Sequence, residues 1–514
     1  MEKVKEVILV SFISLVSTLI AGYNFAISDQ QIFIPYILKF QDPSLFKEDS
    51  LFSQFSANAS LFYQTFAFLT KYTDIQLIFF ACFTIAKAIL FIGIYYLSKS
   101  IFKNRNIALL SLLPFIIPKF IGGTATLTFD SFFGYRSIGQ IFLVFYLLFI
   151  IKKRFVFSSL TGALCLFIHP LSIIPSLPLL PILIFKNSKN KIKDLLIFTV
   201  FTVTFVFFYQ LTFKTDQNLF VHSPKWLSII RARDNYIFMS QWQLLGWLSL
   251  CMYIVLIGIY TKFSKVHKKS DIVLISLISL FMATVASLGL DFFQLPGLAK
   301  FQLVRAVIPI GIFGLIVSPS LLMFKNKTNR FFGFISFVTL SLNLFYVFLI
   351  STVILIILAS REKGTFTQIV PDKLVSLWVV TIAFGFFLNT FYFRNAIQFP
   401  LQPNDWTSVQ IWSKNNTPKE SIFIVPPTLA GFRIFSSRTI VGDVKDGAVV
   451  LYSEGYAEHW DRLMKELAYF DKMNEVDFKT FSKMQRYDYI VTPKPQKLNF
   501  PVIYQNNSYT VYKI

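Results

Sequence analysis

Charged side chains are scarce in this sequence, and acidic ones are the scarcest. Only 15% of the 514 residues are charged, and Asp and Glu together number 27 against 49 Lys and Arg. Hydrophobic residues make up 54% of the chain and include 62 Phe. A soluble fold of this length does not bury so much apolar surface. The composition therefore excludes an ordinary soluble protein and predicts an α-helical polytopic membrane protein.

Cysteine is also rare. The chain has three cysteines, Cys82, Cys165 and Cys251, which lie far apart inside apolar runs. This arrangement lacks the close spacing of metal ligands. We therefore interpret all three as small residues packed within the membrane region.

Basic residues give the chain a formal net charge of +22. They fall mostly in short clusters between apolar runs rather than in one contiguous basic domain, which argues against a nucleic-acid partner. Clusters placed in this way indicate membrane topology instead. We expect a multi-pass protein of the cell (cytoplasmic) membrane.

Apolar runs near the length that crosses a bilayer, roughly 20 residues, recur along residues 1–395. We expect about twelve transmembrane helices, within a range of about eleven to thirteen. The two runs around His169-Pro170 fit either two short spans or a re-entrant hairpin, and the run 331–359 is long for one span and short for two. The expected spans lie near 6–27, 76–98, 107–121, 137–151, 155–168, 171–186, 194–213, 241–261, 271–290, 303–324, 331–359 and 374–392.

The connections between these runs alternate in charge. Every second connection carries a Lys/Arg cluster, and the positive-inside rule assigns these clusters to the cytoplasm; they lie at 99–105, 152–154, 186–193, 262–269 and 325–330. The connections between them then face outward, and the longest, the first outer loop at 28–75, is acidic. Because the run 331–359 fits one span or two, counting does not assign a side to the C-terminal domain.

Polar residues at the helix ends gather on the predicted outer side. An arginine there has the ordinary alternative of reaching lipid headgroups, and a histidine before proline can cap backbone groups. Ionisable groups at membrane depth are costly, so we interpret the set as a cationic pocket that contains a carboxylate. Its members are Asp29, Asp130, Arg136, His169, Arg231, Arg233, Asp291, Gln302 and Arg305.

An arginine pocket at the outer leaflet suits a lipid-linked phosphate. The planar guanidinium binds phosphate oxygens bidentately and keeps its charge at any relevant pH. An aspartate beside the phosphate can act as general base on an acceptor hydroxyl. This combination indicates sugar transfer from a polyprenyl-phosphate carrier.

Four short stretches resemble the GT-C superfamily of polytopic glycosyltransferases, and a poorly characterised bacterial group within it. They are the first outer loop 28-SDQQIFIPYILKFQDPSLFKEDSLF-52, the His-Pro-Leu break at 169–171, the loop 231-RARDNYIFMSQW-242 and the Phe-Gln-Leu-Val-Arg sequence at 301–305. The resemblance implies that Asp29, in the first outer loop, is the catalytic base or orients the acceptor, and a structural role for Asp29 stays open. Many such enzymes carry two adjacent acidic residues there, whereas this chain has Asp29-Gln30, so a requirement for a divalent cation stays open.

The role implied by the resemblance carries over to Asp29 only, and the cationic pocket itself gives the remaining residues of the outer side their expected roles in substrate binding. Arg136, Arg231, Arg233 and Arg305 are candidate phosphate ligands, and His169 and Gln302 are candidates to orient the donor, with Asp130 beside them. The implied partners are a polyprenyl-phosphate-linked sugar donor, membrane lipid, and a glycan, lipid or protein acceptor. Two other classes stay open: a transporter or flippase of lipid-linked glycans, and a non-catalytic subunit that binds them.

Residues 400–514 have the composition of a small soluble domain. A capped helix at 404–415, strands near 421–425, 438–442, 487–492 and 501–513, and a helical stretch at 454–484 predict an α/β fold. Within it Arg433, Arg438 and Lys445 either point toward the membrane cavity or lie as surface charges on a strand pair. In the resembling family such a domain is extracytoplasmic, and we expect the same side here.

Overall fold

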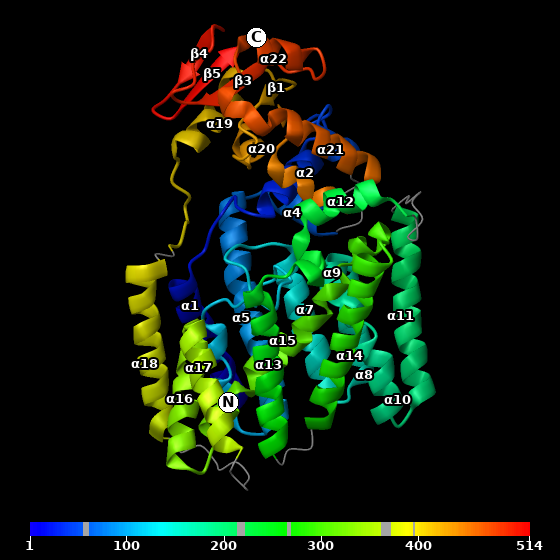
Figure 1. Ribbon diagram of the computed structural model, residues 1–514, viewed down its shortest axis with the longest axis vertical. Helices are drawn as coiled ribbons and strands as arrows, with labels where there is room; N and C mark the ends of the chain where they lie inside the picture. Colours follow the sequence, from blue (N-terminus) through cyan, green and yellow to red (C-terminus); the bar gives the residue numbers. More distant parts are fainter. Residues whose placement is uncertain (55–60, 213–221, 265–268, 361–371, 394–395) are drawn as a thin grey trace.

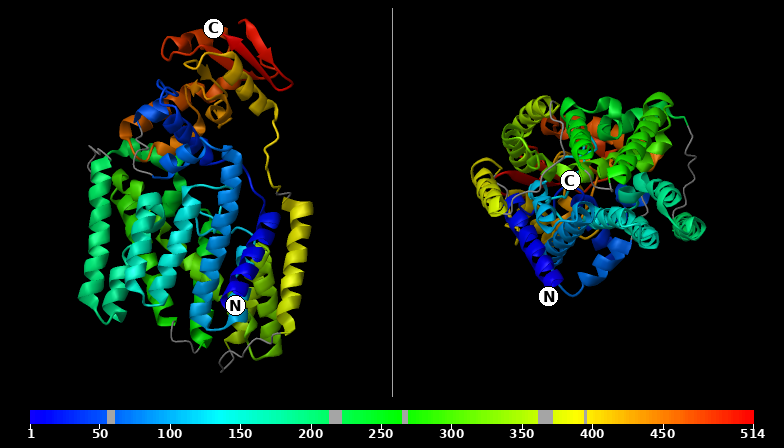
Figure 2. Two further views of the ribbon diagram at one scale, coloured as in Figure 1. Left: turned by 180° about the vertical axis from the view of Figure 1, so that it is seen from behind. Right: turned by 90° about the horizontal axis from the view of Figure 1, so that it is seen from below.

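The protein has a bundle of apolar helices at one end and a small domain with a β-sheet at the other (Figure 1). The computed structural model describes residues 1–54, 61–212, 222–264, 269–360, 372–393 and 396–514. The N-terminus lies in the helical bundle, and the C-terminus lies in the sheet domain at the opposite end, in views from the front and from behind (Figure 2).

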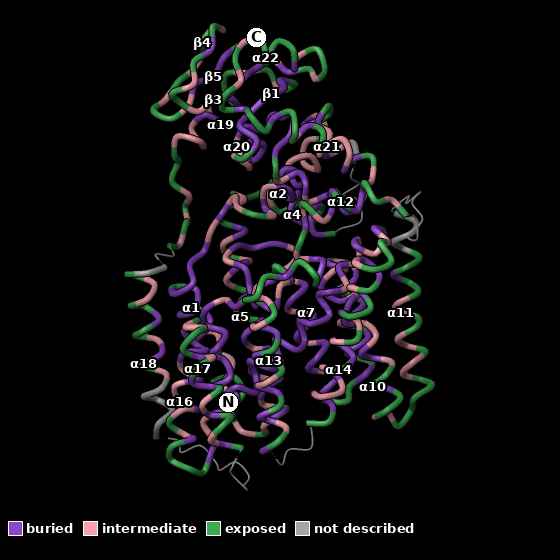
Figure 3. The backbone as a smooth tube through the Cα atoms, in the orientation of Figure 1, coloured by how far each residue is buried: buried purple, intermediate pink, exposed green. Residues whose placement is uncertain are grey.

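Five helical segments in the described residues are long and apolar enough to cross a membrane. They are α1 (Glu2–Ala21), α5 (Ile75–Phe102), α13 (Leu244–Phe263), α14 (Lys269–Ser287) with the π-turn that follows it to Phe292, and the segment Leu303–Leu322 built around α15 (Ile308–Val317). Large apolar side chains such as Phe12, Leu277 and Phe281 are exposed, and exposed positions recur along the outer helices of the bundle (Figure 3). Exposed apolar side chains on helices of this length fit a lipid environment, so the chain is a membrane protein.

A further apolar segment is bent, and fits either a broken span or a re-entrant loop. Residues Pro170–Ser176 and the helix α10 (Leu179–Asn187) meet at an angle of 44°. Proline at 175 and 178 removes two backbone donors at this bend. Shorter apolar helices in the bundle include α6 (Arg105–Leu110), α7 (Tyr135–Ile151), α8 (Phe155–Ile168) and α18 (Asp372–Leu388), and the 22-residue helix α11 (Lys191–Thr212) packs against α8.

The run 331–359 is a helical hairpin rather than one span. Its arms are α16 (Lys327–Ser341) and α17 (Phe345–Ala359), which pack against each other. Asn343 in the turn adopts a φ of 61° and donates a hydrogen bond to the Pro118 carbonyl at 2.9 Å. Asn is one of the few residues that takes this left-handed conformation at low cost, which explains the sharp turn. The hairpin begins and ends at the end of the bundle far from the sheet domain (Figure 1).

The C-terminal domain contains a five-stranded sheet in the order β2-β1-β3-β5-β4. Parallel strands β2 (Thr439–Ile440), β1 (Ile422–Ile424) and β3 (Tyr489–Pro493) are followed by an antiparallel hairpin of β5 (Tyr509–Lys513) and β4 (Val502–Gln505). The stretch 501–513, expected as one strand, is therefore two. One face packs against α19 (Asp405–Asn416) and α20 (Phe432–Ser436), and the other against α21 (Glu454–Glu466) and α22 (Glu475–Ser482).

Three short helices lie between the bundle and this domain: α2 (Gln30–Gln41), α4 (Leu61–Leu69) and α12 (Pro224–Arg233) (Figure 1). Their buried side chains form one apolar cluster with residues of α20 and α21, such as Ile434 and Tyr456. The indole of Trp226 donates to the Val450 carbonyl at 2.8 Å. The C-terminal domain is thus packed directly onto the first outer loop and onto the connection that precedes α13.

Candidate functional site

Asp29 lies where the first outer loop, helix α7 and the C-terminal domain meet. It occupies the N-cap position of α2, and its side chain is 29% exposed. One carboxylate oxygen, Oδ1, is 2.7 Å from Lys445 Nζ, and the other, Oδ2, is 3.3 Å from Arg136 Nη2. Both oxygens of the predicted base therefore face a cation.

Arg136 joins two carboxylates. Its Nε and Nη2 donate to the two oxygens of Asp130 at 2.8 and 3.2 Å, and the same Nη2 reaches Asp29. Gly134 and Ser137 form a capping arrangement at the start of α7, which places Arg136 in the first turn. This geometry brings together three of the residues that the sequence predicts.

The charges around Asp29 set its protonation. Burial acts to raise its pKa, but Arg136 and Lys445, with a further contribution from Arg305, outweigh burial and hold the pKa below the ordinary value. Asp29 is therefore ionised at neutral pH. The carboxylate is a hydrogen-bond acceptor, as a general base must be, although its basicity is low while both cations are in place.

Arg305 reaches the same group from η7 (Leu303–Val307). Its guanidinium lies 5.7 Å from the centre of the Tyr236 ring. Within the described part of the chain, its buried Nε has no hydrogen-bond partner. The neighbouring Gln302, at a φ of 45°, likewise has a buried Oε1 that accepts no hydrogen bond from any described residue. A donor and an acceptor are therefore available to a ligand at this point.

Arg233 and Asp234 contribute a second set of unpaired atoms at the C-terminal end of α12. Arg233 Nη1 lies 3.5 Å from Asp234 Oδ1. The buried atoms Arg233 Nε and Asp234 Oδ2 have no hydrogen-bond partner among the residues that the structure describes. Burial raises the pKa of Asp234 to about 6, against the opposing charges of Arg233, Lys445 and Arg305. Sequence reasoning missed Asp234, although it directly follows a predicted site residue.

His169 also lies beside Asp29 and Arg136. Its ring centre is 4.8 Å from that of Tyr135, which precedes Arg136 in α7. Its Nδ1 is 2.6 Å from the Ser172 hydroxyl, so the side chain is buried and already hydrogen-bonded. The structure therefore brings His169 to the charged group around Asp29, with its Nδ1 already paired to Ser172.

Three predicted residues lie in other surroundings. Arg231 pairs with Asp291 at 3.3 Å and covers the Phe238 ring. Arg433 is buried in an ion cluster with Asp49 and Asp446. Arg438 donates to the carbonyls of Lys414 and Thr417 and so closes the C-terminal end of α19. All three arginines are paired with groups of the chain itself. Each of them therefore stabilises a local structure.

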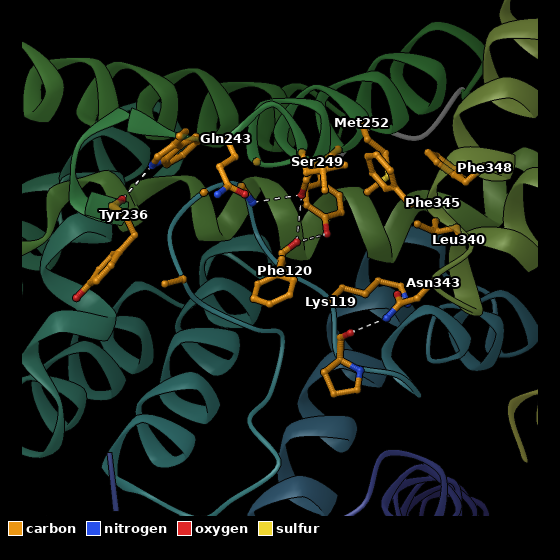
Figure 4. A pocket seen from close by; sticks show the side chains of 18 of the residues that line it. Lys119, Phe120, Tyr236, Gln243, Ser249, Met252, Leu340, Asn343, Phe345 and Phe348 are labelled. Carbon is orange, nitrogen blue, oxygen red and sulfur yellow. Dashed lines mark hydrogen bonds between the residues drawn. The ribbon is translucent and has the colours of Figure 1, made fainter. Parts of the chain in front are cut away.

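A cavity of about 570 Å³ meets the charged group around Asp29 at Tyr236, whose ring faces Arg305. It lies between the loop 118–125, α13 and the α16–α17 hairpin, with Tyr236 at one end and Asn343 and Phe348 at the other (Figure 4). Its lining is mostly apolar. Tyr236 lines the cavity and also faces Arg305, so the two sites share one wall.

The carboxylates around Asp29 are paired with cationic side chains. Among the described ranges, no three His, Cys, Asp or Glu side chains lie close enough together to hold a metal ion. Arg136 separates Asp29 from Asp130 and bonds to both. Arg136 thus pairs with both carboxylates, and Lys445 pairs with Asp29 as well.

Comparison with known proteins adds one finding. A family described as a domain of unknown function (DUF6798) matches residues 404–467, a segment from the N-cap of α19 to the end of α21. No curated protein matches the chain. The C-terminal domain thus contains a segment similar to a recognised family whose function has not been assigned.

Proposed function

We propose that the chain is a GT-C-like membrane glycosyltransferase that moves a sugar from a polyprenyl-phosphate donor to an acceptor hydroxyl at the outer face. The observation that carries the proposal is Asp29: a partly exposed carboxylate among Arg136, Arg305 and Lys445, in a group that meets an apolar cavity at Tyr236. A donor of this class has an apolar chain and a phosphate in adjacent positions. The site offers a surface for each.

Arg305 supports placement of the phosphate. Its unpaired Nε and its position across the Tyr236 ring leave it able to form a charge-assisted hydrogen bond with an anion. Tyr236 also lines the cavity, so an isoprenoid chain lying there would bring its phosphate to Arg305. Burial of the isoprenoid chain in the cavity and pairing of the phosphate with Arg305 would both favour binding.

Asp29 accounts for the transfer step in this proposal. The acceptor oxygen forms a bond to the anomeric carbon while the bond from that carbon to the phosphate oxygen breaks. The acceptor proton goes to Asp29, and the departing polyprenyl phosphate takes the electron pair. One direct displacement inverts the anomeric configuration. Arg305 and Lys445 would stabilise the charge that develops on the leaving phosphate.

The proposed topology has eleven crossings. The α16–α17 hairpin returns to its starting side, and the remaining apolar segments then alternate from α1 to α18 (Figure 1). An odd number places the C-terminal domain opposite the N-terminus, in keeping with an extracytoplasmic site in the cytoplasmic membrane of a bacterium. The lysine-rich connections at 99–105 and 152–154 would then be cytoplasmic.

The proposal is tested by sugar transfer in lipid vesicles. Purified wild type, Asp29→Asn and Arg305→Ala are supplied with a panel of radiolabelled polyprenyl-phosphate sugars and a membrane extract as acceptor. We expect transfer by the wild type and a loss of at least 100-fold in Asp29→Asn, since general-base catalysis contributes about 10²–10⁴. Full activity of both variants would overturn the site. Binding of donors without any transfer would favour the non-catalytic subunit.

A further inference from the structure

Lys445 reaches Asp29 from the C-terminal domain. It lies on the 3-10 helix η10 (Val444–Val449), and its side chain is 19% exposed. The 2.7 Å contact from Nζ to Asp29 Oδ1 joins residues 416 positions apart in sequence. The C-terminal domain therefore contributes a charged side chain to the site in the membrane domain.

The backbone around Lys445 is fixed firmly. Asp443 caps η10 and its carbonyl accepts a hydrogen bond from the Trp460 indole at 3.0 Å. Asp446 bonds to Arg433 through two contacts of 2.8 Å. The backbone of Lys445 is thus held on both sides. The four methylene groups of its side chain allow several rotamers, which place the amine at different positions.

Arg136 is held differently. Its guanidinium donates to both oxygens of Asp130. If the guanidinium moved away, the buried carboxylate of Asp130 would lose its partner. Lys445 has only Asp29 as a charged partner within the described residues. Of the two cations on Asp29, Lys445 is the one free to change partners.

The charge balance favours such a change. The group has four cations, Arg136, Arg233, Arg305 and Lys445, against three carboxylates, Asp29, Asp130 and Asp234, which leaves one net positive charge. A phosphate ester at Arg305 adds negative charge beside Asp29. Two neighbouring anions then compete for the amine of Lys445.

We infer that Lys445 is an exchangeable counter-ion: it neutralises Asp29 in the empty site and moves to the phosphate when a phosphate ester binds at Arg305. The exchange would release one oxygen of Asp29 to accept the acceptor proton. The base would then be active only when the donor is present. This inference rests on the proposed function and adds the regulation of the same site.

The test is a double-mutant cycle in ligand binding. Full-length wild type, Asp29→Asn, Lys445→Met and the double variant are placed in lipid nanodiscs, and binding of farnesyl phosphate is measured against farnesol. Lys465→Met is the matched control, because Lys465 pairs with Asp461 at 2.6 Å on the exposed side of α21. Thermal unfolding of each variant establishes that it is folded.

Removal of the competing carboxylate has a distinctive expected effect. Asp29→Asn should bind farnesyl phosphate about tenfold more tightly, because Lys445 is released, and Lys445→Met about tenfold more weakly, each equal to about 1.4 kcal/mol. In the double variant the gain from Asp29→Asn should fall below about threefold. The affinity for farnesol should be the same in all variants, and Lys465→Met should bind farnesyl phosphate as the wild type does.

The outcomes separate the two proposals. Wild type that binds farnesyl phosphate no better than farnesol would overturn both. Wild type that prefers farnesyl phosphate, with Asp29→Asn unchanged or weaker, would overturn the exchange alone. A tightening in Asp29→Asn that persists fully in the double variant would also overturn it, because Lys445 would not be the group released.

Discussion

Arg433 and Asp49 form a bidentate ion pair across the boundary between the C-terminal domain and the first outer loop. Nε lies 2.7 Å from Oδ2 and Nη2 lies 3.0 Å from Oδ1, and neither side chain is more than 2% exposed. Asp446 completes the other side of the guanidinium. The pair fixes η10, and with it Lys445, above Asp29.

Loss of Arg433 should release the domain. Arg433→Met leaves Asp49 and Asp446 buried without their cation, and breaking a buried pair in this way costs roughly 3–5 kcal/mol. We expect a lower melting temperature and faster hydrogen exchange over residues 422–513. Arg486→Met is the control, since Arg486 meets Glu48 in an exposed pair between the same two regions and should change stability little. Equal effects of the two variants would contradict this account.

The same cluster predicts a pH dependence. Burial, and then the charge of Asp446, raises the pKa of Asp443 to about 8, although Arg433 opposes the shift. In the unfolded chain an aspartate loses its proton near about pH 3.9, so the folded state binds more protons between these values. The raised pKa of Asp443 therefore makes a contribution to the free energy of unfolding that depends on pH. This contribution is fully present at low pH and is lost as pH rises through about 8.

Melting temperatures measured from pH 5 to pH 9 check this dependence, with Asp443→Asn beside the wild type. Asparagine keeps the capping acceptor but cannot titrate, so its melting temperature should vary less over this window. A wild type whose stability rises with pH would have the opposite sign from the one predicted.

The α16–α17 hairpin predicts that residues 325 and 360 lie on one side of the membrane. Cysteine at either position, in a protein with Cys82, Cys165 and Cys251 replaced by serine, should react with an impermeant maleimide only after the cells are permeabilised. Cysteine at Glu420 should react in intact cells. Opposite labelling of 325 and 360 would show that 331–359 crosses the membrane, as one reading of the sequence allowed.

A larger side chain in the cavity should select against long isoprenoid chains. Leu245 lines the cavity and is half exposed, so Leu245→Trp can occupy the space without entering a packed core. We expect the affinity for farnesyl phosphate to fall about tenfold, because one or two methylene groups would no longer be buried, at about 0.8 kcal/mol each. The affinity for isopentenyl phosphate should not change. Leu277→Trp, on the outward face of α14, should change neither.

The sequence predicted those parts of the fold that depend on local pattern. The apolar runs of α1, α5 and α13, and the strand β1 between Ser421 and Pro426, follow from hydropathy and turn residues alone. The α16–α17 hairpin was ambiguous because its arms are each short and apolar. Its turn is fixed by Asn343 and Lys119, which meet only in the folded chain at 2.7 Å.

The site was predictable to a similar extent. Asp29, Asp130, Arg136, His169 and Arg305 were expected on one side from their positions at helix ends, and they lie in one group. The burial of Arg433 against Asp49 was not expected, because a charge pattern does not reveal a partner 384 residues away. The pairing of Lys445 with Asp29 depends on the same long-range docking.

The most direct test measures binding and transfer in one preparation of Asp29→Asn. A general base is needed for the transfer step and not for the donor, so this variant should bind farnesyl phosphate at least as tightly as the wild type and lose sugar transfer by at least about 100-fold. Transfer at the wild-type rate, or binding and transfer lost together, would contradict the assignment of Asp29 as the base.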